Sequence, residues 1–499
     1  MNTSKLFFFM VLCSTFTFAQ VGVNIPSGST VDPSAAFEIQ SGSSKKGLLT
    51  PRMTTAERLS IVTPADGLIV YDTEIGSFYY YKSAKAAIAG PPATPASLAA
   101  WVKISNDVNG RLNFKRIKST DVLATVLAEE LTNGGNSKYQ LKTNTLYEIN
   151  GTVVFDKPID LNKAYIQGLD SGDDRIVAAG NIFDGNTGGT IKGLTLISSA
   201  KVFNITGTTK NENLIFRDCI VANSASVGTI DNMGLVFLSI VQFSANTTGV
   251  TYSNINQLLL SNLGWFGNNK GTFEKLTGTF GLVQKQGGFS DVTDAASTFA
   301  FDVSGNPTIT GDAVLESVVF TGDSTGAKYV NKYTTGSYTG YNFNNSWNVR
   351  STGIPNETDG DASGTFILNY VVGNGISINP TTTPTLINGV SEGANLFRFS
   401  TNNLSRLTYL GKKKRIVSIS GSMSFQAPGI ATYVIYLAKK GVVSQNKFFG
   451  RSNNSNDIVT IPIDGTLELN TGDYVEVYIE KYSGATGNVL IPNMTLSIK

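Results

Sequence analysis

A pair of apolar residues separated by one position recurs through the middle of the sequence, at spacings of 19 to 23 residues. The pairs are Leu194 and Leu196, Leu214 and Phe216, Leu235 and Phe237, Leu258 and Leu260, Phe280 and Leu282, and Phe299 and Phe301. Gly, Asn, Thr and Ser separate these short apolar stretches, which is typical of a solenoid made of strands and turns. The variable repeat length favours a parallel β-helix, in which corners vary while the inward residues stack. A leucine-rich repeat would need Asn or Cys at a fixed offset.

The stretch GLVFLSIVQF, residues 234–243, is almost entirely apolar but far shorter than the ~20 residues of a membrane-spanning helix. Its branched and aromatic residues favour a strand. We expect the coils before and after it to bury this strand, with a ladder inside the solenoid formed by Leu194, Leu214, Leu235, Leu258 and Phe280.

Charge and composition exclude several classes of function. The 39 basic and 37 acidic residues give a net charge of +2, so nucleic acid is not an expected partner. The sequence contains no His, which excludes His-based catalytic triads and imidazole zinc sites. We therefore expect no cofactor and no metal site.

The N-terminal residues 1–19 have the pattern of a secretory signal peptide. Lys5 is followed by the apolar residues 6–12, and Thr17 to Ala19 form a small-residue cleavage site. The mature chain would begin at Gln20, be secreted or surface-bound, and have no segment that inserts into a membrane. Cys219 would then be its single cysteine, without a disulfide partner, and its apolar neighbours predict a buried thiol.

Residues 20–118 form the first predicted module. The motifs GVN…DPSAAFEI, KGLLTPRMTTAER, PADGLIVYDTEIGSFYYY and WVKI occur in this order between residues 21 and about 104. This segment resembles an N-terminal module of exported Bacteroidota surface proteins and of the tail-fibre-like proteins of their phages. The resemblance implies an elongated attachment segment, often trimeric, without catalytic residues; a phage protein would belong to a virion fibre.

A right-handed parallel β-helix is predicted over residues 119–321. Residues 119–135 have helical spacing, with Ser119 or Thr120 as N-cap and Gly134 as the stop, and we expect this helix to cover the open end of the first coil. Residues 139–170 then predict the opening strands, and this succession is similar to the start of pectate-lyase-like β-helices.

The repeat is lost after residue 321, and residues 322–394 are rich in Gly, Asn and Tyr, which predicts a connector. Residues 395–499 contain long alternating strands. The sequences SISGSMSFQAPGIATYVIYLAKKG and LELNTGDYVEVYIEK resemble the jelly roll of the complement globular head and tumour necrosis factor superfamily. This resemblance implies a trimeric C-terminal knob, so the overall expectation is an all-β homotrimer.

One candidate site would suit a polysaccharide-cleaving enzyme. The sequence DSGDDR contributes Asp170, Asp173, Asp174 and Arg175, and Asp184 follows about half a coil later. Glycoside hydrolysis uses a pair of carboxylates across the scissile bond. The alternative is that these are ordinary turn residues, because Asp beside Gly commonly closes a turn.

A second candidate site would bind sugars without cleaving them. Its predicted ligand-binding residues combine flat apolar faces with an amide: Tyr338, Tyr341, Asn342, Phe343 and Trp347. Alternatively, these aromatic residues pack between subunits or against the last coil. The basic run from Lys412 to Arg415 is either an anion-binding patch or a solvated turn.

Together these features predict an exported trimeric fibre-like adhesin or receptor-binding protein, whose partner is a cell-surface glycan or receptor. The alternative is a tailspike-type β-helix enzyme that cleaves polysaccharide, either as a hydrolase or as a lyase.

Overall fold

The computed structural model describes residues 21–23, 29–40, 47–84, 99–104, 113–293, 298–371, 373–402 and 405–499. The predicted signal peptide lies outside these residues. The chain divides into two compact units, Met1–Arg111 and Leu112–Lys499.

The described residues of the first unit include two small sheets and a short helix. Strands β1 (Val21–Val23) and β2 (Phe37–Ile39) pair in parallel, and a separate sheet follows the order β3-β4-β5-β6. Its strands are β3 (Arg52–Met53), β4 (Ile69–Asp72), β5 (Ser77–Lys82) and β6 (Ala100–Lys103). Helix α2 (Thr55–Leu59) begins with a capping box between Thr54 and Glu57. The helix is held to the sheet by a buried ion pair of 3.0 Å between Arg58 and Asp72.

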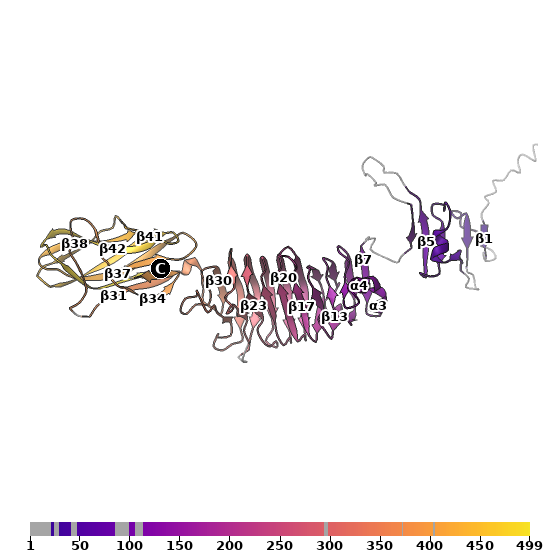
Figure 1. The fold of residues 1–499 in the computed structure, drawn as a ribbon, viewed down its shortest axis with the longest axis horizontal. Helices are drawn as coiled ribbons and strands as arrows, with labels where there is room; N and C mark the ends of the chain where they lie inside the picture. Colours follow the sequence, from indigo (N-terminus) through magenta and orange to yellow (C-terminus); the bar gives the residue numbers. More distant parts are fainter. Residues whose placement is uncertain are drawn as a thin grey trace, which may run out of the picture. The chain divides into compact units, whose positions relative to one another are not determined.

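The second unit begins with a parallel β-helix, whose stacked strands are shown in Figure 1. One sheet, here called sheet A, has its main strands in the order β30-β28-β25-β22-β20-β18-β15-β12-β9-β7. These are β7 (Phe114–Lys118), β9 (Leu146–Asn150), β12 (Tyr165–Gln167), β15 (Gly189–Lys192), β18 (Asn213–Ala222), β20 (Leu235–Ser244), β22 (Gln257–Trp265), β25 (Leu282–Asp291), β28 (Ala313–Thr321) and β30 (Trp347–Thr352). The strands β10 (Thr152–Phe155), β13 (Arg175–Ala178) and β16 (Thr195–Ser198) join sheet A through β18.

The other wall of the β-helix, sheet B, contains one short strand from each coil. Its members are β8 (Tyr139–Gln140), β11 (Ile159–Asp160), β14 (Phe183–Gly185), β17 (Lys201–Thr206), β19 (Ser226–Asp231), β21 (Val250–Ser253), β23 (Glu274–Thr277), β26 (Phe301–Asp302) and β29 (Val330–Asn331). A parallel pair, β24 (Thr279–Phe280) and β27 (Thr308–Ile309), forms a further short edge. All these pairings are parallel, as the repeat predicts.

The predicted ladder has the wrong phase in part. Leu214 is aligned with Val236 rather than Leu235, and Val236 is aligned with Leu258 and then Val283. Leu235 and Phe237 are half-buried and point outward, whereas Val236 and Leu238 are fully buried. Leu194 and Phe280 are buried outside this row. The error arose because GLVFLSI is apolar at both odd and even positions, so alternation could not fix which residues face inward.

The β-helix begins with a capping element, but its helix is shorter than predicted. The segment folds as α3 (Leu123–Val126) and α4 (Ala128–Asn133), with Gly134 at the C-cap. No side chain caps α3, and Val122 is exposed. Strand β7 already pairs with β9, so the first coil starts at Phe114, before the predicted boundary at residue 119.

The C-terminal part of the second unit is a sandwich of two antiparallel sheets. One sheet has the order β34-β31-β43-β37-β41 with β32 on β43, and the other has β35-β36-β42-β38-β39 with β33 on β42 and β40 on β38. The bounds are β31 (Ser363–Asn369), β32 (Ile376–Ile378), β33 (Thr385–Leu386), β34 (Glu392–Phe397), β35 (Phe399–Asn402), β36 (Arg406–Tyr409), β37 (Arg415–Gln426), β38 (Ala431–Lys439), β39 (Val442–Val443), β40 (Phe448–Ser452), β41 (Ile458–Leu469), β42 (Tyr474–Gly484) and β43 (Val489–Ile498). Strands β31-β43-β37-β41 facing β36-β42-β38-β40 have the strand order of a jelly roll.

Residues 322–394 do not form the predicted connector. Strands β29 and β30 complete the last coil of the β-helix, and β31 pairs with the C-terminal strand β43. The sandwich therefore starts near Ser363 rather than at residue 395. The β-helix and the sandwich are linked by the short segment between β30 and β31, which contains the 3-10 helix η2 (Asp359–Asp361).

Candidate functional site

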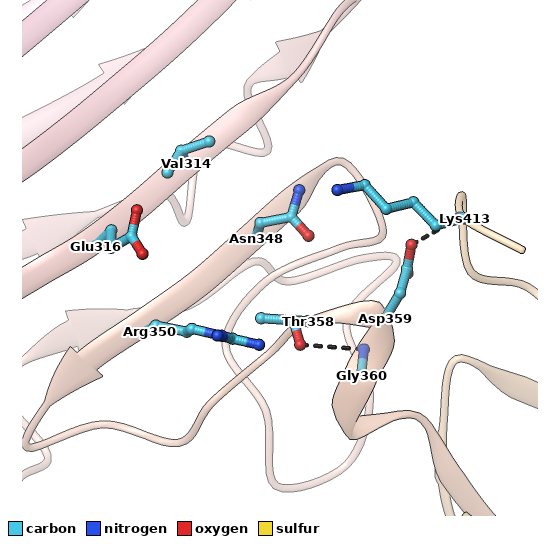
Figure 2. Close-up of a pocket in the computed structure, with 8 residues that line it drawn as sticks. All are labelled: Val314, Glu316, Asn348, Arg350, Thr358, Asp359, Gly360 and Lys413. Atoms are coloured by element: carbon cyan, nitrogen blue, oxygen red, sulfur yellow. Dashed lines mark hydrogen bonds between the residues drawn. The ribbon is translucent and has the colours of Figure 1, made fainter. Parts of the chain in front are cut away.

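A polar groove lies where the last coil meets the sandwich (Figure 2). Its volume is about 410 Å³, and its walls are formed by Val314, Glu316, Asn348, Arg350, Thr358, Asp359, Gly360 and Lys413. The first four residues come from strands β28 and β30, and the others come from η2 and from the turn before β37.

Glu316 and Arg350 are the charged residues of the sheet wall. They are register partners on adjacent strands, while the residues before them, Leu315 and Val349, are fully buried. This alternation turns the two charged side chains outward. Within the described part of the chain, neither side chain has a hydrogen bond or ion pair, so both charges are available to a ligand.

Lys413 supplies a second available cation on the opposite wall. Its three neighbours in the basic run are engaged: Lys412 pairs with Asp312, Lys414 pairs with Glu468, and Arg415 donates to the carbonyl oxygens of Asp359 and Ala362. The Lys413 side chain extends towards Asn348 in Figure 2, and its ammonium group has no partner among the described residues. The solvated-turn interpretation therefore fits Lys412 and Lys414, whose pairs are exposed. Arg415 begins β37 and is bonded to the backbone near η2, and Lys413 faces the groove.

Asp359 shapes the groove but is not available as a free carboxylate. Its Oδ2 accepts the backbone N–H groups of Lys412 and Lys413 at 3.1 and 2.8 Å, and its Oδ1 accepts from Arg398. Arg398 is buried and also donates to the carbonyl oxygens of Trp347 and Glu357. Asp359 thus holds the turn that presents Lys413.

The floor beside Arg350 is formed by the start of η2. Thr358 and Asp361 make a capping box, and Thr358 Oγ1 accepts the N–H of Gly360 at 3.1 Å. A Cβ atom on Gly360 would lie 3.2 Å from Thr358 Oγ1 and 3.9 Å from Arg350 Nη2. A larger residue at position 360 would therefore narrow the groove next to the guanidinium.

Glu316 and Arg350 end an outward row of polar residues along sheet A. In register order this polar row is Arg116, Glu148, Gln167, Lys192, Arg217, Ser239, Ser261, Gln286, Glu316 and Arg350. A second groove of about 430 Å³ lies along the same row and includes Gln167, Asp170, Lys192 and Asp218.

The predicted catalytic carboxylates do not converge on one site. Asp174 is buried and accepts the backbone N–H groups of Gly151, Leu169 and Asp170. Asp170 accepts from Gly172, and Arg175 donates to the Gly172 carbonyl oxygen, so the DSGDDR sequence closes its own turn. Asp173 is exposed in that turn.

Asp184 lies on sheet B instead, where it accepts from the side-chain amides of Asn181 and Asn204. Sequence distance alone could not reveal this separation, because half a coil takes the chain from one wall of the β-helix to the other.

Two of the predicted sugar-binding aromatic residues are not accessible. Phe343 and Trp347 are fully buried, with ring centroids 4.7 Å apart, and Trp347 Nε1 donates to Tyr333 at 3.0 Å. They close the end of the β-helix core, which corresponds to the packing alternative. The predicted sugar-stacking role is thus wrong for these two residues.

The other three residues of this set remain partly exposed. Tyr341 stacks on Phe397 of the sandwich with centroids 4.0 Å apart, and Tyr338 donates to Asn345 at 2.9 Å. The backbone N–H of Asn342 donates to Glu357. These contacts join the last coil to the sandwich, and one face of the Tyr341 ring is covered by Phe397.

Sequence reasoning missed Glu316 and Arg350. They lie 34 positions apart in the sequence. The segment between β28 and β30 is long, so the sequence does not show that these two residues are register partners. The available signal was a charged residue directly after an inward apolar residue in each strand, Leu315-Glu316 and Val349-Arg350.

Among the residues that the structure describes, no group of three or more His, Cys, Asp or Glu side chains could hold a metal ion. None of the helices in these residues is long and apolar enough to cross a membrane.

Residues 22–108 match the family described as "Phage tail like trimerisation region". This match supports a homotrimer and a phage tail-like character for the N-terminal module. No curated protein sequence matches the chain.

Three solved structures are similar at low TM-scores. Eiger TNF from S. frugiperda has 9% identity and a TM-score of 0.20, covering 28% of this chain and 90% of its own. Murine APRIL has 11% identity and a TM-score of 0.20, covering 28% and 98%. The enzymatically active domain of bacteriophage CBA120 tailspike protein 4 has 10% identity and a TM-score of 0.29, covering 91% and 78%. The fold assignment rests on strand pairing within this chain and not on these low-scoring likenesses.

Proposed function

We propose that this protein is an exported, trimeric, fibre-like receptor-binding protein, and that the groove at the end of the β-helix binds an acidic glycan on a cell surface. The observation that carries the proposal is the groove itself, where Glu316, Arg350 and Lys413 lie without partners among the described residues.

The chemistry of the groove suits a sugar that carries carboxylate groups. Arg350 presents a planar fork of donors that matches a carboxylate, and Lys413 adds a compact positive charge. Glu316 can accept sugar hydroxyl groups, and the Asn348 amide can both donate and accept. The carboxylates of the groove also suit binding better than cleavage. Glycoside hydrolysis uses a pair of carboxylates, but Asp359 is paired with Arg398, so Glu316 is the one free carboxylate among the described residues of the lining.

Three copies of a weak site would give a useful affinity. The trimerisation region at residues 22–108 supports three grooves on one particle. Simultaneous engagement can raise avidity by roughly 10² to 10⁴-fold over a single site. The signal-like residues 1–19 support export, and the phage tail-like module supports a place in a fibre.

Binding of the full-length protein to an array of bacterial surface polysaccharides tests the proposal. We expect binding to uronic-acid-containing polymers, with loss of binding in the Arg350→Ala and Lys413→Ala variants. The matched control is Lys332→Ala, which removes an exposed charge outside the groove. Release of oligosaccharides from a bound polymer, abolished by Glu316→Gln, would favour the alternative of a polysaccharide-cleaving enzyme.

A further inference from the structure

A second outward row on sheet A is mainly apolar and carries no charge. In register order, its main apolar members are Phe114, Leu146, Tyr165, Ile215, Phe237 and Leu259, followed by Val314 in the last coils. Thr190, Gln284 and Asn348 fill the remaining positions, so the row contains no charged residue. Tyr165 is 49% exposed and the others are half-buried.

The corresponding outward row on sheet B is polar throughout. It consists of Asp184, Asn204, Thr229, Thr251, Lys275, Asp302 and Asn331, in register order. The outward face of sheet A therefore carries a mainly apolar row beside its polar row, whereas the corresponding row of sheet B is hydrophilic. This difference cannot come from the requirements of the coil core, because both rows point away from it.

Strands of a parallel sheet that is covered on both faces have continuous apolar sequences. This explains why residues 234–243 are apolar at consecutive positions: Val236 and Leu238 fill the coil core, while Leu235 and Phe237 point outward. This row crosses ten strands at ~4.8 Å per strand and has an apolar residue in seven of them, which is more extended than the isolated apolar contacts normal on a monomer surface.

We propose that the apolar row of sheet A packs against the other two copies of this chain in the trimer. The row begins at Phe114, six residues after the end of the matched trimerisation region at residue 108. Three identical rows are thereby tethered at high local concentration. The inference rests on the trimer of the proposed function, and it adds which face of the β-helix is buried.

This packing also places the ligand groove at a subunit boundary. Val314 and Asn348 belong both to the apolar row and to the lining of the groove. A neighbouring copy seated on the row therefore borders the groove next to Glu316 and Arg350. The neighbouring copy would form one rim of each glycan site.

Cysteine accessibility in the full-length protein, with Cys13 replaced by Ala, tests this assignment. Phe237→Cys and Thr251→Cys place a thiol on the outward rows of sheet A and sheet B, and both positions are half-buried in the single chain. Native Cys219 is a low background, because its thiol is buried. We expect a maleimide to label Phe237→Cys about tenfold more slowly than Thr251→Cys, since labelling requires the interface to open.

A second pair of variants separates the interface from simple loss of folding. Phe237→Lys should lower the melting temperature of the trimer, whereas the matched Thr251→Lys should not. Equal labelling rates of Phe237→Cys and Thr251→Cys, in a protein that sediments as a trimer, would overturn the assignment of this face. The trimer itself would still stand. A monomeric mass for the wild-type protein would overturn both this inference and the trimer of the proposed function.

Discussion

Arg398 and Asp359 form a buried ion pair that joins the sandwich to the end of the β-helix. Arg398 follows β34 directly, and Asp359 begins η2 after the last coil. The same guanidinium reaches the carbonyl oxygens of Trp347 and Glu357, so one side chain bonds to three positions of the neighbouring element. The turn that presents Lys413 to the groove depends on this pair through Asp359.

Replacing Arg398 by Ala should destabilise the second unit strongly. The variant leaves the Asp359 carboxylate buried without its cation, which typically costs about 3–5 kcal/mol. Chemical denaturation of the full-length protein should show this loss. Arg451→Ala, which removes an exposed arginine of the sandwich, is the control and should change the free energy of unfolding little. Equal stability of the two variants would contradict the anchoring role.

The stability of the junction should decrease as the pH rises from about 4.5 to 7. Burial raises the pKa of Glu357 from 4.5 to about 7, although its carboxylate accepts the N–H groups of Asn342 and Phe343. The folded state then binds more protons than the unfolded state across this window, so the stabilisation is complete below pH 4.5 and is lost as the pH passes 7. The effect is at most about 3 kcal/mol.

Glu357→Gln should remove this contribution, because glutamine does not titrate. Denaturation midpoints at pH 5 and pH 8 provide the test. The denaturation midpoint of the wild-type protein should be higher at pH 5 than at pH 8. The difference between the two midpoints should be smaller in the Glu357→Gln variant. The same pH dependence in both proteins would show that another group is responsible.

A substitution at Ile240 should stabilise the β-helix. Ile240 is 53% exposed and has a φ of 55°, in a column of left-handed corner residues with Asp218, Asn262, Gly287 and Ser317. A β-branched residue is disfavoured there, whereas Asn tolerates this conformation. Ile240→Asn should therefore raise the free energy of unfolding by about 1 kcal/mol. Thermal melts of the two variants and of the wild-type protein provide the test. Val319→Asn, at an exposed position without positive φ, is the control and should not raise the melting temperature.

Cys219 should be inert in the folded protein. Burial raises the pKa of its thiol to about 12, so thiolate is scarce at pH 8. Iodoacetamide should modify Cys219 only after denaturation, as mass spectrometry of the intact protein would show. Rapid modification of the native protein would mean that the corner between Arg217 and Cys219 opens easily.

The repeat predicted the β-helix because each coil needs an inward apolar residue at a regular interval, and the strand pairing confirms this. It could not predict Lys285, which occupies the inward row between Leu260 and Leu315. Lys285 forms a fully buried ion pair of 2.8 Å with Glu274 of sheet B. Alternation within one strand does not show which residue of the opposite sheet a side chain will contact, so this ion pair could not be predicted from the sequence.

The groove could be predicted only in part. The basic run from Lys412 to Arg415 is visible in the sequence, but which of its side chains is free is not. The partners of Lys412, Lys414 and Arg415 come from distant segments. For Phe343 and Trp347 the sequence allows both a sugar-binding role and packing against the last coil, because aromatic residues among Asn and Gly suit either. In the structure the end of a solenoid needs large apolar side chains to close its core, and these two residues fill it.

Protection of Lys413 by a bound glycan is the most direct test of the groove. The full-length protein is acetylated at low reagent concentration, with and without the acidic polysaccharide that it binds best on the array, and each lysine is quantified by mass spectrometry. We expect the polysaccharide to protect Lys413 while the exposed control Lys332 reacts equally in both samples. Binding of the polysaccharide with unchanged acetylation of Lys413 would contradict the assignment of the groove as the glycan site.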